Sequence, residues 1–375
     1  MIPQVVIDKF NSLPKKGKPL VRTNNVPEWT TLAGLVLTST MDDSSTCVCL
    51  CTGVKATPDE KLSCSNGFLL HDMHAEILVL RAFNVFLIEE GKKAESEYVE
   101  TLESGKRRLK PHFKVSLWIS ELPCGDSSME CIQDNADDDW GAAPQDCVLR
   151  GREYYTTTGR VRTKPGRRDS PMTLSKSCSD KLAMKQYTGV VMGVVERVFE
   201  QVYLDELVVP AGNDIGIKRA FRDRLEQGIK RTLDGEEVES TAPKPRYFDT
   251  ITTDTTFAYS QEPGRKPSAS SIIWTINTGN EVVLNGVKMG HKPTNMNPQS
   301  ASKVSRQAIW MATKPLLKDS QFDDYYSAKC CVGRTEKIQM GHTALHAWHC
   351  TCKDNFRLSG DNEKETGDIQ PGILN

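Results

Sequence analysis

The most constraining stretch of the chain is "HDMHAEILVLRAFNVFLIEE", residues 71–90, where two histidines and a glutamate precede an apolar run. The apolar spacing predicts a buried helix that begins near His74. A buried helix needs other elements around it, and 375 residues with 38% hydrophobic content supply enough for a sizeable core. The sequence therefore predicts a layered globular protein in which polar side chains open a buried helix.

The pattern along the rest of the chain alternates between strand-like and helix-like segments. Strands are expected at 45–55, 112–124, 200–209, 271–277 and 281–286, and helices at 27–37, 177–199, 300–313 and 336–350. This alternation favours an α/β core, with a C-terminal helical and strand extension packed on it. Because no linker interrupts it, we expect a single domain over residues 1–352 and a disordered polar tail over 353–375.

The sequence also predicts where in the cell the protein is located. No apolar run approaches the ~18–20 residues of a membrane span, and no signal-peptide core opens the chain. We therefore expect an intracellular protein, cytoplasmic or nuclear or both, with no membrane contact and no obligate protein partner. The net charge is −1, so any nucleic-acid binding requires a local basic patch.

Three expected helix starts carry side chains that bind zinc. His74 opens the buried helix, Cys124 follows a strand in "LPCGD", and Cys178 lies in "LSKSCSDK". A catalytic zinc site takes three such ligands and leaves a position for water. Glu76 lies two residues after His74, where it can reach that water without being a ligand and can transfer its proton. The pattern H-x-E with P-C is typical of zinc nucleobase deaminases, although Ser127 replaces the second cysteine of that signature.

In this order, "HAE", "PCGD" and "SCSDK" resemble the adenosine deaminases acting on RNA, over residues 28 to 349. "TGVK" (52–55), "RTKPGRRD" (162–169) and "SASKVSRQAIWM" (300–311) add to the resemblance. It implies a cytidine-deaminase-like sheet with helices on both faces, zinc on His74, Cys124 and Cys178, and Glu76 as the proton shuttle. Since double-stranded-RNA-binding domains have no room here, the branch that acts on tRNA is favoured, with adenosine 37 of alanine tRNA (tRNA-Ala) as the target.

Alternatives to this function remain open at the level of the sequence. They are a deaminase of messenger or double-stranded RNA, a non-catalytic RNA-binding module, and another zinc hydrolase. Intact Glu76 argues against the binding module, because binding alone does not need a proton shuttle.

The resemblance also implies a buried inositol hexakisphosphate. The positions that match its ligands in the family are Arg81, Lys181, Lys303, Tyr325, Lys329 and Trp348. Asp72 and Lys181 match a relay between this polyphosphate and the zinc site. Met184 and Leu80 stand where the family has basic residues.

Two further clusters call for an interpretation. The basic segment 159–176 predicts a phosphate-binding rim, with Arg162, Lys164, Arg167 and Arg168 as RNA contacts, and Lys55 matches a family position near the target nucleotide. "GHTALHAWHCTC" (341–352) contains His342, His346, His349, Cys350 and Cys352 and could form a second metal site. We favour a packed C-terminal helix there, because the other three residues already account for zinc.

Overall fold

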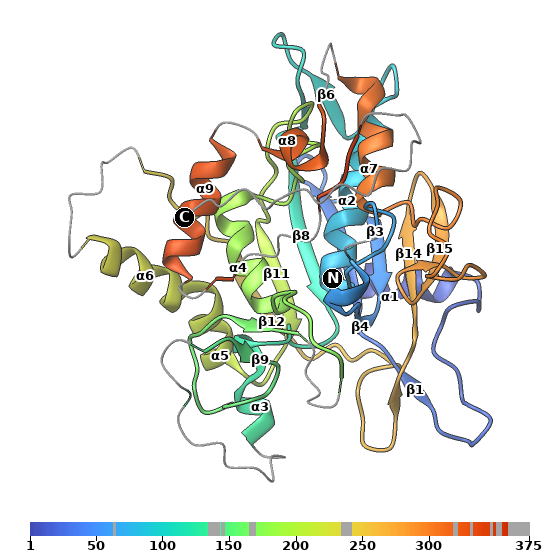
Figure 1. Ribbon diagram of the computed structural model, residues 1–375. Helices are drawn as coiled ribbons and strands as arrows, with labels where there is room; N and C mark the ends of the chain where they lie inside the picture. The colour runs from blue at the N-terminus through green and yellow to red at the C-terminus, as the bar shows by residue number, and fades with distance from the viewer. Residues whose placement is uncertain are drawn as a thin grey trace.

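The computed structural model is built around an eight-stranded mixed sheet (Figure 1). It describes residues 1–62, 65–133, 143, 147–164, 170–233, 242–317, 322–330, 333–345, 348–349 and 355–358. From edge to edge the strands are β12 (Asp249–Thr253), β11 (Glu206–Pro210), β8 (Phe113–Ile119), β2 (Leu32–Ser39), β3 (Ser45–Thr52), β14 (Ser270–Thr275), β15 (Gly279–Leu284) and β16 (Val287–Lys288). The pairs β8–β11 and β11–β12 are parallel and the other pairs antiparallel.

Helices cover both faces of this sheet. Alternate residues of β2 pack into two separate buried clusters, one with α2 (Ala75–Gly91) and the other with α1 (Ile2–Ser12). Gly34 explains how closely α1 can approach, because a Cβ atom there would lie 2.4 Å from the Val6 side chain. The predicted α/β architecture with helices on both faces is therefore confirmed.

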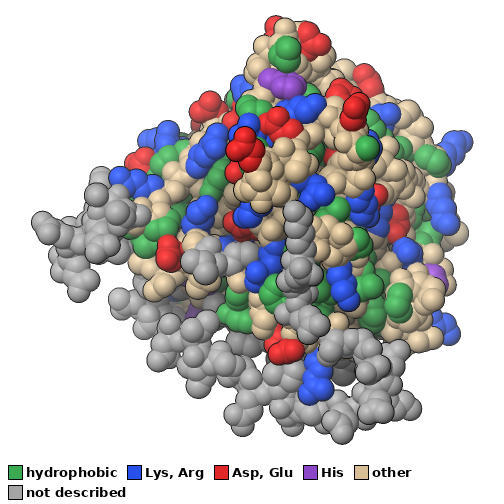
Figure 2. Space-filling view, turned by 90° about the horizontal axis from the view of Figure 1, so that it is seen from above, with side chains coloured by type: hydrophobic (Ala, Val, Ile, Leu, Met, Phe, Trp, Pro, Cys, Tyr) green, Lys and Arg blue, Asp and Glu red, His purple; other side chains and the backbone are tan. Residues whose placement is uncertain are grey.

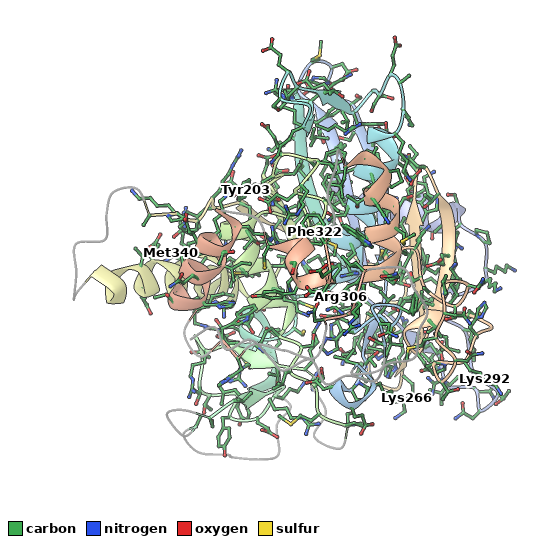
Figure 3. The ribbon with its side chains drawn as sticks, turned by 45° about the horizontal axis from the view of Figure 1, so that its top comes forward. Tyr203, Lys266, Lys292, Arg306, Phe322 and Met340 are labelled. Atoms are coloured by element: carbon green, nitrogen blue, oxygen red, sulfur yellow. The ribbon has the colours of Figure 1, made fainter. Side chains whose placement is uncertain are left out.

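The C-terminal third returns to pack on the core. Helix α9 (Arg334–Ala344) contacts α4 (Cys178–Thr188) and α6 (Arg224–Leu233), and α7 (Arg306–Thr313) contacts α2. Phe322, labelled in Figure 3, packs edge-on against Trp310 of α7. The other described α-helices are α3 (Glu130–Gln133), α5 (Asp214–Lys218) and α8 (Tyr325–Lys329). Short 3-10 helices lie at Asp59–Lys61, Asp126–Ser128 and Lys314–Leu316, and a π-helical segment at Arg219–Asp223.

Small two-stranded sheets lie outside the main sheet. Their strands are β1 (Glu28–Trp29) with β13 (Lys266–Pro267), β4 (Val54–Ala56) with β5 (Asp72–His74), β6 (Val99–Thr101) with β7 (Arg107–Leu109), and β9 (Leu149–Arg150) with β10 (Arg162–Thr163). Among the residues described, no helix has both the length and the apolar character needed to cross a bilayer.

Two expectations from the sequence are wrong. The helix expected at 27–37 is largely strand β2, which lies between β3 and β8 and is buried on both faces. A central strand of this kind is an unbroken apolar run, which periodicity does not separate from a buried helix. The tail expected to be disordered from 353 includes residues 355–358, where Phe356 is buried and stacks on Tyr325 with 4.8 Å between ring centres. The rest of that tail lies outside the described residues.

Candidate active site and metal centre

His74 stands where strand β5 becomes helix α2. The β4–β5 hairpin places it opposite Val54, and the residue acts as the N-cap of α2. Its backbone N–H donates to Asp72 Oδ1 at 3.0 Å. The β4–β5 pairing and this bond hold the imidazole near the end of β8, where Cys124 follows.

Cys124 and Cys178 reach the same place from two other chain segments. Cys124 follows β8 and precedes Gly125, whose φ of 99° suits glycine and where a Cβ atom would lie 2.2 Å from Ser177 Oγ. Cys178 is the first residue of α4, which Ser177 caps by accepting from the Asp180 N–H. The backbone N–H of Cys178 points to Cys124 Sγ at 3.4 Å, so a helix N-terminus faces that sulfur.

The three side chains have the separations of a tetrahedral zinc site. His74 Nδ1 lies 3.5 Å from Cys178 Sγ and 3.7 Å from Cys124 Sγ, and the ligand atoms of all three lie within 4.8 Å of one another. Zinc–ligand bonds of about 2.0–2.3 Å in a tetrahedron put neighbouring N and S atoms about 3.6 Å apart. An imidazole nitrogen and two sulfurs at these distances therefore fit a zinc ion.

Proton affinities at the two sulfurs differ. The pKa of Cys124 is well below its ordinary value, first because of the hydrogen bond with the Cys178 thiol and then because of His74 and Lys164, with burial opposing them. The pKa of Cys178 is well above its ordinary value, first because of burial and then because of Cys124. The site therefore favours a thiolate at Cys124, the form of cysteine that binds a metal.

Glu76 lies in the first turn of α2, beside the three candidate ligands. The side chain is 3% exposed, and its Oε2 has no hydrogen-bond partner among the described residues. Burial raises the pKa of this carboxyl group above its ordinary value. A buried carboxyl with a free oxygen and a raised pKa is suited to accept and return a proton.

Behind the ligands lies a buried charge network centred on Asp72. Lys164 Nζ donates to both Asp72 oxygens, at 2.7 and 2.6 Å, and approaches Cys178 Sγ at 3.3 Å. Lys181 Nζ also donates to Asp72 and to Ser175 Oγ. Burial alone would raise the pKa of Asp72, but the charges of Lys164 and Lys181 outweigh it and lower that pKa well below its ordinary value. The network connects Lys181 to Cys178 through Asp72 and Lys164.

A cavity of about 310 Å³ lies on the other side of Lys181. Its described lining contains four cations and no carboxylate; the cations are Arg81, Lys181, Lys185 and Arg334. Burial, followed by repulsion from Arg334, lowers the pKa of Lys185 to about 7. Sequence reasoning missed Lys185 and Arg334, although Lys185 follows Lys181 by one helical turn and so shares its face.

The residues predicted to hold a polyphosphate do not all line this cavity. Arg81, Lys181 and Trp348 do, as do Met184 and Leu80. Three others lie outside its described lining: Lys303 Nζ donates to the Gly279 carbonyl at 2.6 Å, Tyr325 stacks on Phe356, and Lys329 Nζ lies 5.0 Å from the centre of the Tyr326 ring.

Two of the predicted RNA contacts are buried, which corrects the interpretation of segment 159–176 as a solvent-facing rim. Arg162 is fully buried, and its guanidinium donates to the carbonyls of residues 151, 153, 154 and 157. Lys164 belongs to the Asp72 network. Arg167 and Arg168 lie outside the described residues, and Lys55 lies in β4, one residue from the partner of His74.

The C-terminal histidine and cysteine cluster is described only in part. His342 of α9 stacks on Trp348 with 5.2 Å between ring centres, although α9 ends at Ala344 and Trp348 lies outside the helix expected to contain it. His346, Cys350 and Cys352 lie outside the described residues.

One histidine and two cysteines that can bind a metal, with a buried glutamate beside them at the strand ends of an α/β sheet, define a class of hydrolase that removes the amino group of a nucleobase. Within that class, the chain belongs to the adenosine-deaminase (editase) domain family, whose model matches residues 49–334. It is therefore an adenosine deaminase by family.

Relatives of the chain fall into two groups. It is 34% identical to tRNA-specific adenosine deaminase 1 of Schizosaccharomyces pombe, over 93% of this chain and 94% of that protein. It is 32% identical to the Saccharomyces cerevisiae protein of the same name, over 86% and 85%. Double-stranded RNA-specific editase B2 of Mus musculus is 23% identical, over 76% of this chain and 39% of that protein.

Proposed function

We propose that the protein is a zinc-dependent enzyme that hydrolyses adenosine to inosine in tRNA, at adenosine 37 of tRNA-Ala. The observation that carries the proposal is the convergence of His74, Cys124 and Cys178 at zinc-site separations beside the buried Glu76. Support for tRNA comes from the relatives, because the tRNA-specific enzymes of the two yeasts match over 94% and 85% of their own length and editase B2 over 39%. The position and the tRNA species rest on the sequence resemblance.

In the proposed mechanism His74, Cys124 and Cys178 hold the ion, and Glu76 moves the protons. Zinc bound there would lower the pKa of water to about 7 and so supply a nucleophile at neutral pH. Glu76 accepts a proton from the water that attacks C6 of adenine, and then gives a proton to the departing amino group. Adenosine and water thereby become inosine and ammonia, and Glu76 ends in its starting state.

The RNA backbone needs accessible cations near this site, and we propose the exposed Lys266 and Lys292, together with the half-buried Lys55, in place of Arg162 and Lys164. The segment with Lys266 leads into the start of β14, and the segment with Lys292 follows β15 and β16. These strand ends lie on the same side of the sheet as the end of β3, which continues into β4. Figure 3 labels both lysines, which are exposed and have no ion-pair partner among the described residues. Figure 2, which views the molecule from above Figure 1, shows basic and acidic side chains interspersed on that face, and a face of mixed charge suits a polyanion less well.

We also propose that the cavity beside α4 holds inositol hexakisphosphate. Asp72 pairs with Lys181 and Glu196 pairs with Arg334, but the cavity lining itself holds four cations and no described carboxylate. Arg and Lys are the side chains that bind phosphate, so this lining suits a polyanion. In this arrangement Lys181 contacts the polyphosphate and Asp72 at once. The series of contacts Lys181–Asp72–Lys164–Cys178 then links the charge of the cavity to the active site. Lys164 belongs to this series although the sequence did not predict it.

The test of the function is to incubate the purified protein with total tRNA and to map inosine by sequencing. The expected product is inosine at position 37 of tRNA-Ala, with none formed by Glu76→Gln. Inosine in a double-stranded RNA and none in tRNA would instead support the messenger-RNA type of activity. No inosine in either substrate, from protein that contains zinc, would contradict the proposal.

A further inference from the structure

His71 has no part in the proposed chemistry, yet it lies at the centre of a buried hydrogen-bond cluster. Its Nε2 lies 2.6 Å from Thr173 Oγ1 and 3.0 Å from Asp59 Oδ1, and Thr173 Oγ1 donates to the same Asp59 oxygen at 2.7 Å. His71 is 8% exposed and Thr173 1%. We call these three residues the Asp59–His71–Thr173 cluster.

Backbone hydrogen bonds extend the cluster to the chain segments around it. Asp59 Oδ2 accepts from the N–H of Leu174 at 2.9 Å, and Thr173 Oγ1 accepts from the N–H of Ser175 at 3.1 Å. The Thr57 N–H donates to the carbonyl of His71 at 2.7 Å. Residues 57–59 and 71, which are near one another in the sequence, are therefore tied at one point to the distant segment 172–175.

Two of these segments lead directly to candidate metal ligands. His71 is followed by Asp72 and then by His74, which opens α2. Thr173 is followed by Ser175, whose hydroxyl donates to Asp72 Oδ2 at 3.3 Å, and then by the cap and first residue of α4, Ser177 and Cys178. The cluster thus sets the position of the strand end that carries His74 relative to the helix start that carries Cys178.

A catalytic role for the cluster does not fit its geometry. In a nucleophilic triad the hydroxyl and the carboxylate contact different nitrogens of the histidine ring. Here Thr173 and Asp59 both approach Nε2. The directions of the hydrogen bonds instead fit a rigid structural link, in which the ring N–H donates to Thr173 and the Thr173 hydroxyl donates to Asp59.

We propose that the Asp59–His71–Thr173 cluster is a positioning device that holds His74 and Cys178 at metal-binding separation. This inference rests on the proposed zinc-dependent function. Groups that orient metal ligands are typically worth about 10–100-fold in metal affinity or activity. Loss of the cluster is therefore expected to speed zinc release and to lower kcat while leaving tRNA binding intact.

The test compares Thr173→Val with Thr173→Ser. Valine keeps the size and branching of threonine but removes the hydroxyl, whereas serine keeps the hydroxyl. The rate of zinc transfer to a coloured chelator, kcat and KM are measured on the full chain, together with hydrogen exchange at the Leu174 amide. For Thr173→Val we expect about tenfold or more faster zinc release, a kcat lower by about 10–100-fold, a KM within about twofold of wild type and faster exchange at Leu174. Thr173→Ser should stay within about threefold of wild type in each measurement.

The outcomes separate this inference from the function on which it rests. Wild-type protein without zinc or deaminase activity would contradict the proposed function itself. Active wild-type protein, with Thr173→Val releasing zinc no faster than Thr173→Ser, would overturn the positioning role alone. If Thr173→Val does not fold, zinc release from Asp59→Asn, which keeps the shape of the side chain but not its charge, gives the same comparison.

Discussion

The variant Lys185→Met tests whether the cavity binds a polyphosphate, because it should raise the unfolding free energy without the ligand and lower it with the ligand. Lys185 lines the cavity with Arg81, Lys181 and Arg334. Burial and the charge of Arg334 lower its pKa from 10.5 to about 7. In polyphosphate-free protein this ammonium group therefore opposes folding, and methionine removes the charge while keeping most of the side-chain volume.

The size of the effect follows from the shift in pKa. One unit corresponds to about 1.4 kcal/mol, so a group with a pKa near 7 in the folded state costs about 4 kcal/mol of unfolding free energy at pH 7. Because Lys185 is partly exposed towards the cavity, water reduces this cost to about 2–4 kcal/mol. The unfolded chain binds the extra proton between pH 7 and 10.5, so stability should rise with pH across that interval. Lys185→Met should lack this rise.

The assay is urea unfolding at pH 7 and pH 9.5, with and without inositol hexakisphosphate, and with Lys92→Met on the exposed end of α2 as the control. Without the ligand, Lys185→Met should be about 2–4 kcal/mol more stable than wild type at pH 7, and the difference should shrink at pH 9.5. With saturating ligand the order should reverse, since the variant has lost a phosphate contact. A variant that is less stable than wild type without the ligand, or a difference that does not depend on pH, would refute the argument.

Three other predictions concern the active site and the RNA surface. Glu76→Gln should retain zinc and tRNA binding but lose about 10⁴-fold in kcat, the upper end for general acid–base catalysis, because one carboxyl group serves both proton transfers; a loss of under about tenfold would reject that role. Cys178→Ala should lose zinc together with activity when metal content is measured by mass spectrometry, and full occupancy would show that the third ligand lies elsewhere. Lys266→Ala should weaken tRNA binding and lower the slope of log affinity against log salt by up to about one unit, with Lys92→Ala as the unchanged control.

Local patterns were enough to predict the candidate metal ligands. His74, Cys124 and Cys178 each stand at the start of a helix or in the turn after a strand, and these boundaries are visible in a single sequence. That the three side chains meet was an expectation, and only the fold places their ligand atoms within 4.8 Å of one another. The cavity cations Lys185 and Arg334 come from helices far apart in the chain, so no local pattern pairs them.

The basic segment shows where the reasoning from sequence fails. Arg162 and Lys164 lie in a run of positive charge, which usually faces solvent, and both are buried. Four backbone carbonyls compensate the guanidinium of Arg162, and Asp72 compensates Lys164. A run of charged residues shows the charge of each side chain, but it does not show which distant partner compensates that charge when the side chain is buried.

What the sequence by itself determined is the chemistry that the chain can perform and the class of its fold. Residue types at helix starts and the alternation of strands with helices are local properties, so both can be recognised in the sequence alone. Only the tertiary structure decided that 32–39 is a central strand rather than a helix, that Lys164 faces Asp72 rather than RNA, and that His71 braces two ligand-bearing segments. The physical reason is that burial and partnership depend on contacts between residues far apart in the chain, and these contacts override local preference wherever a segment is enclosed on all sides.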